Sequence, residues 1–393
     1  MRQMGRLRLR VASPSAFDRE ETEMRVLEIN SVCGIRSTGR IVGELADAFI
    51  KDGHQCRIAY GREQAASAYE KISHRIGTET DVRLNALAAR LFDDEGFNAV
   101  AETRRLLQWA ERYDPDLVWL HNLHGYYINV EMLFDWLKRR PQTIVRWTLH
   151  DCWAFTGHCA HFSYVHCDQW KTECQNCCQR GEYPKSWLAD NCAKNFQRKR
   201  QAFCGVKNMT LITPSKWLAN LVGKSFLQEY PVEVIPNRID TTVFKPTESN
   251  FRASYQLEHK KIILGVASAW SEKKGLTDFI KLAEMLPSFC IVVLVGLTKE
   301  QIKKMPREIL CIERTNSTQE LAGIYTAADV FVNLTYEDTY PTVNLEAQAC
   351  GTPCLTYRTG GSVETVSQDC VAEQGNLQEI MKKIMQITTK EYI

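Results

Sequence analysis

The sequence lacks the features that mark several large classes of protein. No apolar run approaches the roughly 20 residues that a bilayer-spanning helix requires, and residues 1–23 lack the apolar centre of a secretory signal. The formal net charge of the 393 residues is only +2, which argues against a protein that coats nucleic acid. Repeats of solenoid period and low-complexity tracts are absent as well. We therefore expect a globular protein of the cytoplasm, with no nucleic acid among its partners.

The start of the chain is basic and then polar, and the first strand pattern begins only at Met24. We expect residues 1–23 to be a loose extension, or the result of a start codon assigned too early. A short basic targeting tail is the less favoured interpretation.

Two runs of alternating strand and helix patterns fill the rest of the chain. Apolar, β-branched segments such as "RVLEINSV" and "KIILGVAS" alternate with helical segments such as "GRIVGELADAFIKDG" and "GLTDFIKLAEML". Such alternation predicts parallel sheets covered by helices on both faces. A polar segment with two prolines, residues 236–261, separates the runs. We predict an α/β protein with two doubly wound, Rossmann-like domains, residues 24–245 and 246–393.

A glycine-bearing loop, "SVCGIRSTGRI", follows the first strand. Gly34 and Gly39 have the spacing of a phosphate loop, but Arg40 and Ile41 stand where that motif requires Lys and Ser or Thr. The dinucleotide fingerprint G-x-G-x-x-G is also missing. Two interpretations stay open: a tight turn, or a loop that lets the backbone at the start of a helix approach an anion.

Ionisable residues stand at two further strand ends, where open α/β sheets bind ligands. His150 and Asp151 end the strand pattern "TIVRWTLHD", and Lys273 and Lys274 precede a helix in "SAWSEKKGL". The histidine is either structural or a ligand contact. The lysines are either a solvated charge pair or cations directed at a diphosphate.

The most specific stretch is "TYEDTYPTVNLEAQACGTP", residues 335–353, which carries the acids Asp338 and Glu346 eight residues apart. It follows the buried strand pattern "VFVNL" and opens a helix. Pro341 suits a first helical turn, where no N–H donor is needed. The free N–H groups of Thr342 and its neighbours can therefore hold an anion. Glu346 lies one turn further along, within reach of a ribose beyond a bound phosphate.

Four ordered motifs, "VIPNRIDTTVFKP", "SEKKG", "EDTYPTVNLEAQACGTP" and "GGSVE", resemble those of the retaining, nucleotide-sugar-dependent glycosyltransferases of the GT-B fold, family four. The subgroup is similar to bacterial capsule and exopolysaccharide enzymes, and the resemblance runs from about Met24 nearly to the end of the chain. It implies two facing domains, of which the second holds a nucleotide-sugar donor and the first shapes the acceptor site.

The resemblance also implies roles for residues of the second domain. In that family, a glutamate that matches Glu346 binds the nucleotide ribose, and a lysine that matches Lys274 binds the diphosphate. The residues that match Tyr340, Pro341 and Thr342 hold phosphate and sugar through backbone N–H groups. No set of metal ligands is visible there to take up the leaving charge, so we expect no catalytic metal and assign that task to Lys274.

Further roles follow from the resemblance at the first domain and the acid pair. A histidine that matches His150 contacts the donor sugar, and the loop from Gly34 to Gly39 lies under the diphosphate. The first acid of the family's Glu-x7-Glu pair falls on Asp338, with Glu337 beside it, and either one could contact the sugar. We take His150, Asp338 and Lys274 as the candidate catalytic residues.

The chain departs from the family pattern in two further ways. The arginine that normally precedes the lysine is replaced around residues 268–269, so Arg36 or Lys273 would have to supply the second phosphate clamp. The chain also stops at "ITTKEYI", where relatives continue into a closing helix that crosses back to the first domain. We expect that crossing helix to be missing.

Fifteen cysteines in a long chain without a secretory signal do not indicate a disulfide framework. Four of them, Cys159, Cys167, Cys174 and Cys177, lie in an insert of the first domain, residues 152–190, and include one C-x-x-C. Four soft ligands in a segment with a poor apolar pattern suit a closed, structural zinc site. The alternative is a set of free loop thiols.

We expect an enzyme that transfers a hexose from a UDP- or GDP-sugar to a lipid-linked or free saccharide with retention, in polysaccharide biosynthesis. One alternative is a sugar-nucleotide epimerase on the same architecture. Another is an inactive, truncated paralogue that only binds nucleotide. The basic run Arg198, Lys199 and Arg200 either lies against the anionic inner membrane surface or forms a solvated helix face.

Overall fold

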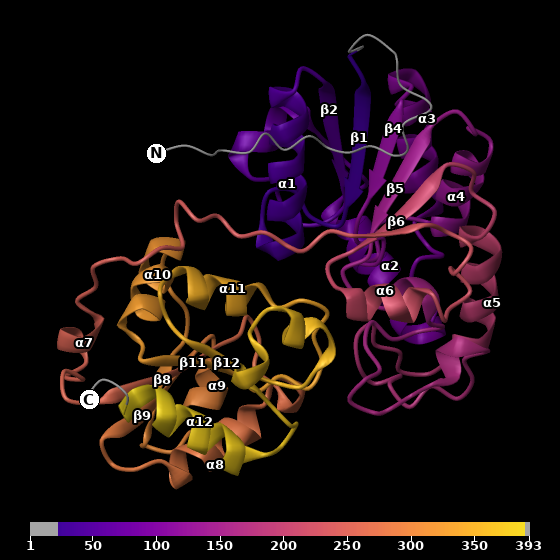
Figure 1. Ribbon diagram of the computed structural model, residues 1–393. Coiled ribbons are helices and arrows are strands. Elements are labelled where there is room, and N and C mark those ends of the chain that lie inside the picture. Colours follow the sequence, from indigo (N-terminus) through magenta and orange to yellow (C-terminus); the bar gives the residue numbers. More distant parts are fainter. Residues whose placement is uncertain (1–22, 390–393) are drawn as a thin grey trace.

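The computed structural model describes residues 23–389 and contains two parallel sheets, each belonging to its own domain (Figure 1). The expected N-terminal extension lies, apart from Glu23, outside the described residues. The first sheet has seven strands in the order β3-β2-β1-β4-β5-β6-β7, and the second has six in the order β10-β9-β8-β11-β12-β13. The predicted α/β class, with two doubly wound domains, is confirmed.

The first domain alternates strands and helices along the chain. Its strands are β1 (Arg25–Asn30), β2 (Gln55–Tyr60), β3 (Ser73–Arg75), β4 (Leu117–Leu120), β5 (Ile144–Thr148), β6 (Met209–Thr213) and β7 (Val232–Val234). Its helices are α1 (Arg36–Lys51), α2 (Glu79–Phe92), α3 (Val100–Tyr113), α4 (Val130–Lys138), α5 (Cys192–Phe203) and α6 (Lys216–Val222). The sheet order reverses between β1 and β4, which makes that carboxyl edge a ligand position.

The second domain repeats the pattern after an extended segment that runs between β7 and α7 (Figure 1). Its strands are β8 (Lys261–Val266), β9 (Cys290–Val295), β10 (Ile309–Ile312), β11 (Val330–Asn333), β12 (Cys354–Tyr357) and β13 (Val371–Ala372). Its helices are α7 (Phe251–Ser254), α8 (Leu276–Met285), α9 (Lys299–Ile302), α10 (Thr318–Ala327), α11 (Thr342–Ala349) and α12 (Leu377–Thr389). Helix α12, the last described, packs on the second domain's core through Leu377, Ile380 and Ile384.

The basic run on α5 does not form one continuous charged surface, so it gives no support to the suggested membrane contact. Lys199 is buried, and its ammonium donates to the carbonyl oxygens of Trp153 at 2.8 Å and Thr156 at 3.1 Å. Arg198 forms a two-point pair with Glu131, and only Arg200 of the three is exposed. The sequence could not show the burial of Lys199 or the pairing of Arg198, because their partners lie on other segments of the chain. No helix within residues 23–389 is long and apolar enough to cross a bilayer.

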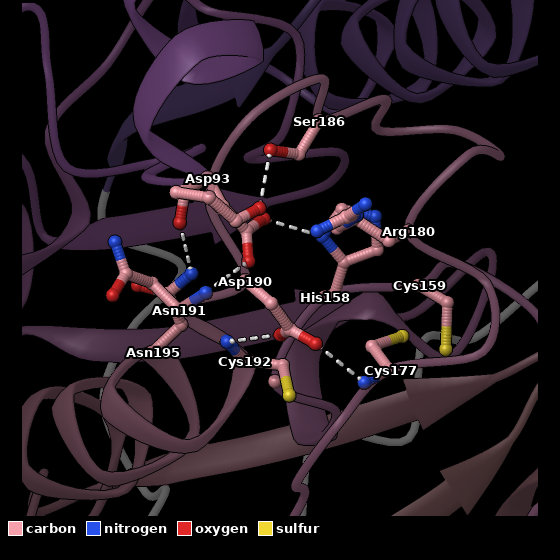
Figure 2. Close-up of polar contacts among 12 residues, drawn as sticks. Asp93, His158, Cys159, Cys177, Arg180, Ser186, Asp190, Asn191, Cys192 and Asn195 are labelled. Carbon is pink, nitrogen blue, oxygen red and sulfur yellow. Dashed lines mark hydrogen bonds and ion pairs between the residues drawn. The ribbon is translucent and has the colours of Figure 1, made fainter.

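The insert is tied to the rest of the first domain through Asp93, which ends α2 in a left-handed conformation (Figure 2). The Asp93 carboxylate is buried and contacts His158 Nδ1 of the insert, and it accepts from the Asn191 N–H at 2.7 Å. The Asp93 carbonyl accepts from the Asn195 side chain of α5. One residue therefore holds α2, the insert and α5 together.

Replacing Asp93 with Asn should lower the free energy of unfolding by about 1–3 kcal/mol, because buried partners lose a charged acceptor. Asn tolerates the left-handed backbone, so the loss reports on the carboxylate. The matched control is Asp94→Asn, whose half-buried carboxylate accepts from Asn98. Urea unfolding followed by tryptophan fluorescence measures both, since eight of the nine tryptophans precede residue 246. Equal losses in the two variants would contradict this role of Asp93.

Candidate functional site

The site lies where the carboxyl edge of the first sheet meets the segment between β11 and α11. The Thr339 hydroxyl donates to the carbonyl of His150, just past β5, at 2.8 Å. The Asn237 side chain donates to the carbonyl of Tyr340 at 3.3 Å. The Glu364 carboxylate accepts from the first N–H groups of α6, those of Lys216 and Trp217, at 2.9 and 2.8 Å. These contacts bring the predicted site residues of both domains together.

Two lysine–acid pairs sit side by side at the start of this segment. The Lys274 ammonium lies 2.9 Å from Asp338 Oδ2, and the Lys273 ammonium lies 3.3 Å from Glu337 Oε2. The family resemblance implies that either Asp338 or Glu337 contacts the sugar and that Lys274 contacts the diphosphate. Because each lysine already neutralises an acid, a diphosphate has to compete with these carboxylates for the ammonium groups.

Lys273 does not point to solvent but contacts the insert of the first domain. Its ammonium donates to Gln179 Oε1 at 3.0 Å and lies 3.5 Å from Glu182. Its side chain is 21% exposed, compared with 38% for Lys274. Lys274 is therefore the more accessible cation of the two.

Of the neighbouring acids Glu337 and Asp338, Glu337 is the one that contacts the first domain. Its Oε1 accepts from the backbone N–H of Tyr164 in the insert at 2.9 Å, while Oε2 faces Lys273. Its side chain is nearly buried, whereas that of Asp338 is 20% exposed. Asp338 Oδ1 accepts from the N–H of Tyr340 at 3.1 Å, which turns the chain toward Pro341. Of the two acids, Asp338 is the more open to a ligand.

The N-terminus of α11 has no side-chain cap and no acid in its first turn. Pro341 stands at the capping position, so the N–H groups of Thr342 and its neighbours carry the positive end of the helix dipole. Helix α1 of the first domain also starts without a side-chain cap or an acid in its first turn. Both predicted anion positions are therefore electropositive without a resident carboxylate.

Glu346 lies in the second turn of α11 and is held by the neighbouring helix α10. The hydroxyl of Tyr325 donates to Glu346 Oε2 at 3.1 Å. Burial raises the pKa of Glu346, while Tyr325 and Arg40 of α1 oppose that rise. The charge of Arg40, near the start of α1, thus acts on Glu346. The hydrogen bond from Tyr325 thus holds one oxygen of this buried carboxylate, and the ribose contact stays a prediction.

The glycine loop is a tight turn packed against the first domain. The N–H of Gly34 donates to the carbonyl of Gly39 at 3.0 Å, and Gly34 has a φ of +70°. A Cβ at Gly34 would lie 2.5 Å from the ring of Tyr69, so no larger residue fits. Arg36, a possible second phosphate clamp, is mostly exposed and pairs with Glu63 at 2.7 Å. The turn interpretation therefore accounts for Gly34, and an anion at the start of α1 stays a prediction.

Sequence reasoning missed the residues beneath His150. His121 follows β4, and its Nδ1 lies 3.3 Å from Nε2 of His150. Burial lowers the pKa of His150 to about 4, so this ring is neutral at neutral pH. In the sequence, His121 follows the strand pattern "VWL" as His150 follows the next strand pattern. Because parallel strands end at the same sheet edge, this shared position could have predicted that the two rings are neighbours.

The four candidate zinc ligands, Cys159, Cys167, Cys174 and Cys177, line one small cavity together with His158 and a further cysteine of the insert, Cys178. All fifteen cysteines are free, and a hydrogen bond from Cys159 lowers the pKa of Cys177 to about 7. Figure 2 shows the sulfur atoms of Cys159 and Cys177 close together. Within residues 23–389, no group of three or more His, Cys, Asp or Glu side chains stands where it could hold a metal ion. The clustering expected of a zinc site is present, but its ligand geometry is not.

Two protein-family models match this chain, one over each domain. The family described as "Glycosyltransferase Family 4" matches residues 38–243, and "Glycosyl transferases group 1" matches residues 247–391. The putative colanic acid biosynthesis glycosyl transferase WcaC of Escherichia coli K12 is 26% identical over 210 residues, which cover 50% of each chain. The processive diacylglycerol alpha-glucosyltransferase of Acholeplasma laidlawii is 26% identical over 41% of this chain and 51% of its own. The chain thus spans about half the length of these curated relatives.

Solved structures support the same architecture. The structure of the Anabaena protein HepE in complex with UDP has a TM-score of 0.63 and 14% identity, and it covers 94% of this chain and 90% of its own. Such a likeness shows the shared GT-B fold. The two parallel sheets and the motifs between them agree with the family match over most of the chain. We conclude that this chain belongs to glycosyltransferase family 4.

Proposed function

We propose that the protein transfers a hexose from a nucleotide sugar to a saccharide acceptor with retention at the anomeric carbon. One observation carries the proposal: Asp338, the uncapped start of α11 and Glu346 follow one another along a single segment that contacts the edge at His150. Sugar, diphosphate and ribose of one donor follow one another in the same order. A lipid-linked acceptor is supported by the name of the Acholeplasma relative, which acts on diacylglycerol.

The donor base is the first point to test. UDP is the favoured nucleotide because it is bound in the HepE structure, and GDP is the alternative. A thermal-shift screen with UDP-, GDP- and ADP-sugars separates these, since a ligand at 100 times its Kd stabilises the folded state by about 2.7 kcal/mol. Stabilisation by none of them would contradict the proposal. Donor conversion without acceptor would indicate an epimerase, and binding without transfer or donor hydrolysis would indicate an inactive paralogue.

The residues have distinct tasks in this reaction. Negative charge grows on the diphosphate as the glycosidic bond breaks, and Lys274 and the N–H groups at Thr342 are the groups that offset it. For this, the Lys274 ammonium exchanges Asp338 for a phosphate oxygen. Asp338 is then free to accept a hydroxyl of the sugar, close to His150.

Replacing Lys274 with Ala should lower kcat by about 10²–10³-fold, because an interaction that strengthens as charge develops appears in kcat. The matched control is Lys273→Ala, which should lower kcat by less than about tenfold, since that ammonium is shared among Gln179, Glu182 and Glu337. Steady-state kinetics with the preferred donor measures both. The reverse ranking would move the phosphate contact to Lys273.

Replacing Glu346 with Ala should weaken donor binding by about 1.5–3 kcal/mol, which appears as a higher donor KM with little change in kcat. The reason is that ribose contacts hold substrate and transition state equally. The donor KM of Glu346→Gln, which keeps one acceptor oxygen, should lie between that of the natural protein and that of Glu346→Ala. A collapse of kcat at unchanged KM would assign Glu346 to the chemical step instead.

We also propose that the thiols of Cys159, Cys167, Cys174 and Cys177 bind one structural zinc ion, which requires them to rotate toward the cavity that they share. Metal analysis of protein purified without chelator should then find one zinc per chain. Cys174→Ser with Cys177→Ser should remove it and destabilise the first domain, whereas Cys290→Ser with Cys311→Ser should keep it. Metal-free native protein, with unchanged stability in the first double variant, would end this proposal.

A further inference from the structure

Three neighbouring strands of the first sheet place a buried carboxyl and two imidazoles in one line. Glu28 lies on β1, His121 follows β4 and His150 follows β5, and these strands are adjacent in the order β1-β4-β5. Glu28 Oε2 is 3.5 Å from His121 Nε2, and His121 Nδ1 is 3.3 Å from His150 Nε2. The two imidazole rings lie 5.6 Å apart at an angle of 17°. The line therefore runs from the protein interior to the ligand edge.

The inner end of this line is sealed from solvent. Glu28 is fully buried and His121 is 2% exposed. Glu28 Oε2 and His121 Nε2 each lack a well-formed hydrogen bond in the described chain, and each is the other's polar neighbour. Buried polar atoms without a partner are costly, so a proton shared between these two atoms is the arrangement that satisfies both.

The surroundings favour the uncharged form of every member. Burial raises the pKa of Glu28 well above its usual range, and the Asp47 carboxylate of α1 adds to the rise. On the other sides, the Cys56 thiol of β2 donates to Glu28 Oε1 at 3.4 Å, and the Cys33 thiol lies nearby. Burial lowers the pKa of His121 well below its usual range.

Charged groups also face the outer end of the line. Asp151 raises and His124 lowers the pKa of His150, and these two pair with each other at 2.8 Å. Their opposing effects leave burial as the main influence on this ring, so His150 is neutral as well.

We infer that Glu28 and His121 are positioning residues that fix which nitrogen of His150 carries its proton. With the proton on Glu28, the carboxyl O–H donates to His121 Nε2, and His121 Nδ1–H donates to His150 Nε2. His150 then keeps its own proton on Nδ1, as a donor for an oxygen of the donor sugar; this last contact rests on the proposed function. No net proton transfer is needed, because only the hydrogen-bond directions are set.

Loss of the Glu28 proton reverses every direction in the line. The carboxylate then accepts from His121 Nε2–H, His121 Nδ1 accepts from His150 Nε2–H, and His150 Nδ1 becomes an acceptor. The sugar oxygen loses its donor. Because burial raises the pKa of Glu28, this change occurs only as the pH rises above the usual range of a carboxyl, and kcat/KM of the natural protein should fall there, as an alkaline fall of the profile.

The test combines a conservative variant with a spectroscopic measurement. In Glu28→Gln, the amide N–H donates to His121 Nε2 at every pH, so activity should be kept and the alkaline fall should disappear. In Glu28→Leu, which offers no donor, kcat/KM should drop about tenfold at neutral pH. Cys56→Ser, which keeps the carboxyl and a donor to Glu28 Oε1, is the control that should still show an alkaline fall. An unchanged alkaline fall in Glu28→Gln would overturn the inference.

Imidazole ¹⁵N NMR of the natural protein tests the same point without activity. The His121 and His150 signals, assigned by their loss in His121→Asn and His150→Asn, should show protonated Nδ1 and unprotonated Nε2 on both rings at neutral pH. The opposite pattern would overturn the inference even where a variant fails to fold. This pattern in a protein without transfer activity would support the inference and reject only the proposed function.

Discussion

The contact between the β11–α11 segment and the first sheet is the constraint on which the rest of the site depends. A doubly wound sheet offers a ligand position only at its carboxyl edge, so two such domains share a site only if these edges face each other. Here Thr339 bonds to the backbone of His150, and Tyr164 bonds to Glu337. Because the second bond comes from the insert, residues 152–190 help to hold the donor-side segment in place. The insert therefore belongs to the site although it contributes no strand to the sheet.

Charge balance explains how such a site can be both stable and ready for an anion. The adjacent lysines would repel each other strongly if they were unpaired, and the acids Glu337 and Asp338 offset this repulsion. The two helix N-termini remain free of carboxylates, so their partial charges stay available. If a diphosphate takes the place of Asp338 beside Lys274, one ion pair is replaced by another. Under the proposed function, recognition of the donor then depends on many moderate contacts.

The sequence predicts those features whose cause is local. Buried parallel strands are apolar runs, so most strands could be predicted. The exceptions are β3, whose three residues Ser-His-Arg include no apolar side chain, and β13, which has only two residues. Motif spacing predicted roles for Lys274, Asp338 and Glu346. The structure places the Lys274 ammonium 2.9 Å from Asp338, and the three roles stay predictions. Features that depend on distant partners could not be predicted: Lys199 points inward to Trp153, Lys273 contacts the insert, and Glu28 meets His121 across the sheet. In each case the amino-acid pattern fixes the backbone, while the partner of the charged group is set by tertiary packing.

The central claim is that the start of α11 and the lysine loop together hold the diphosphate of the donor. Amide hydrogen exchange measured by mass spectrometry tests it most directly, with peptides that cover residues 272–276 and 340–346, in UDP and in uridine at saturating concentration. The account predicts slower exchange of both peptides with UDP and no comparable change with uridine, because only the diphosphate accepts these N–H groups. Unchanged exchange with bound UDP, or equal protection by uridine, would contradict it.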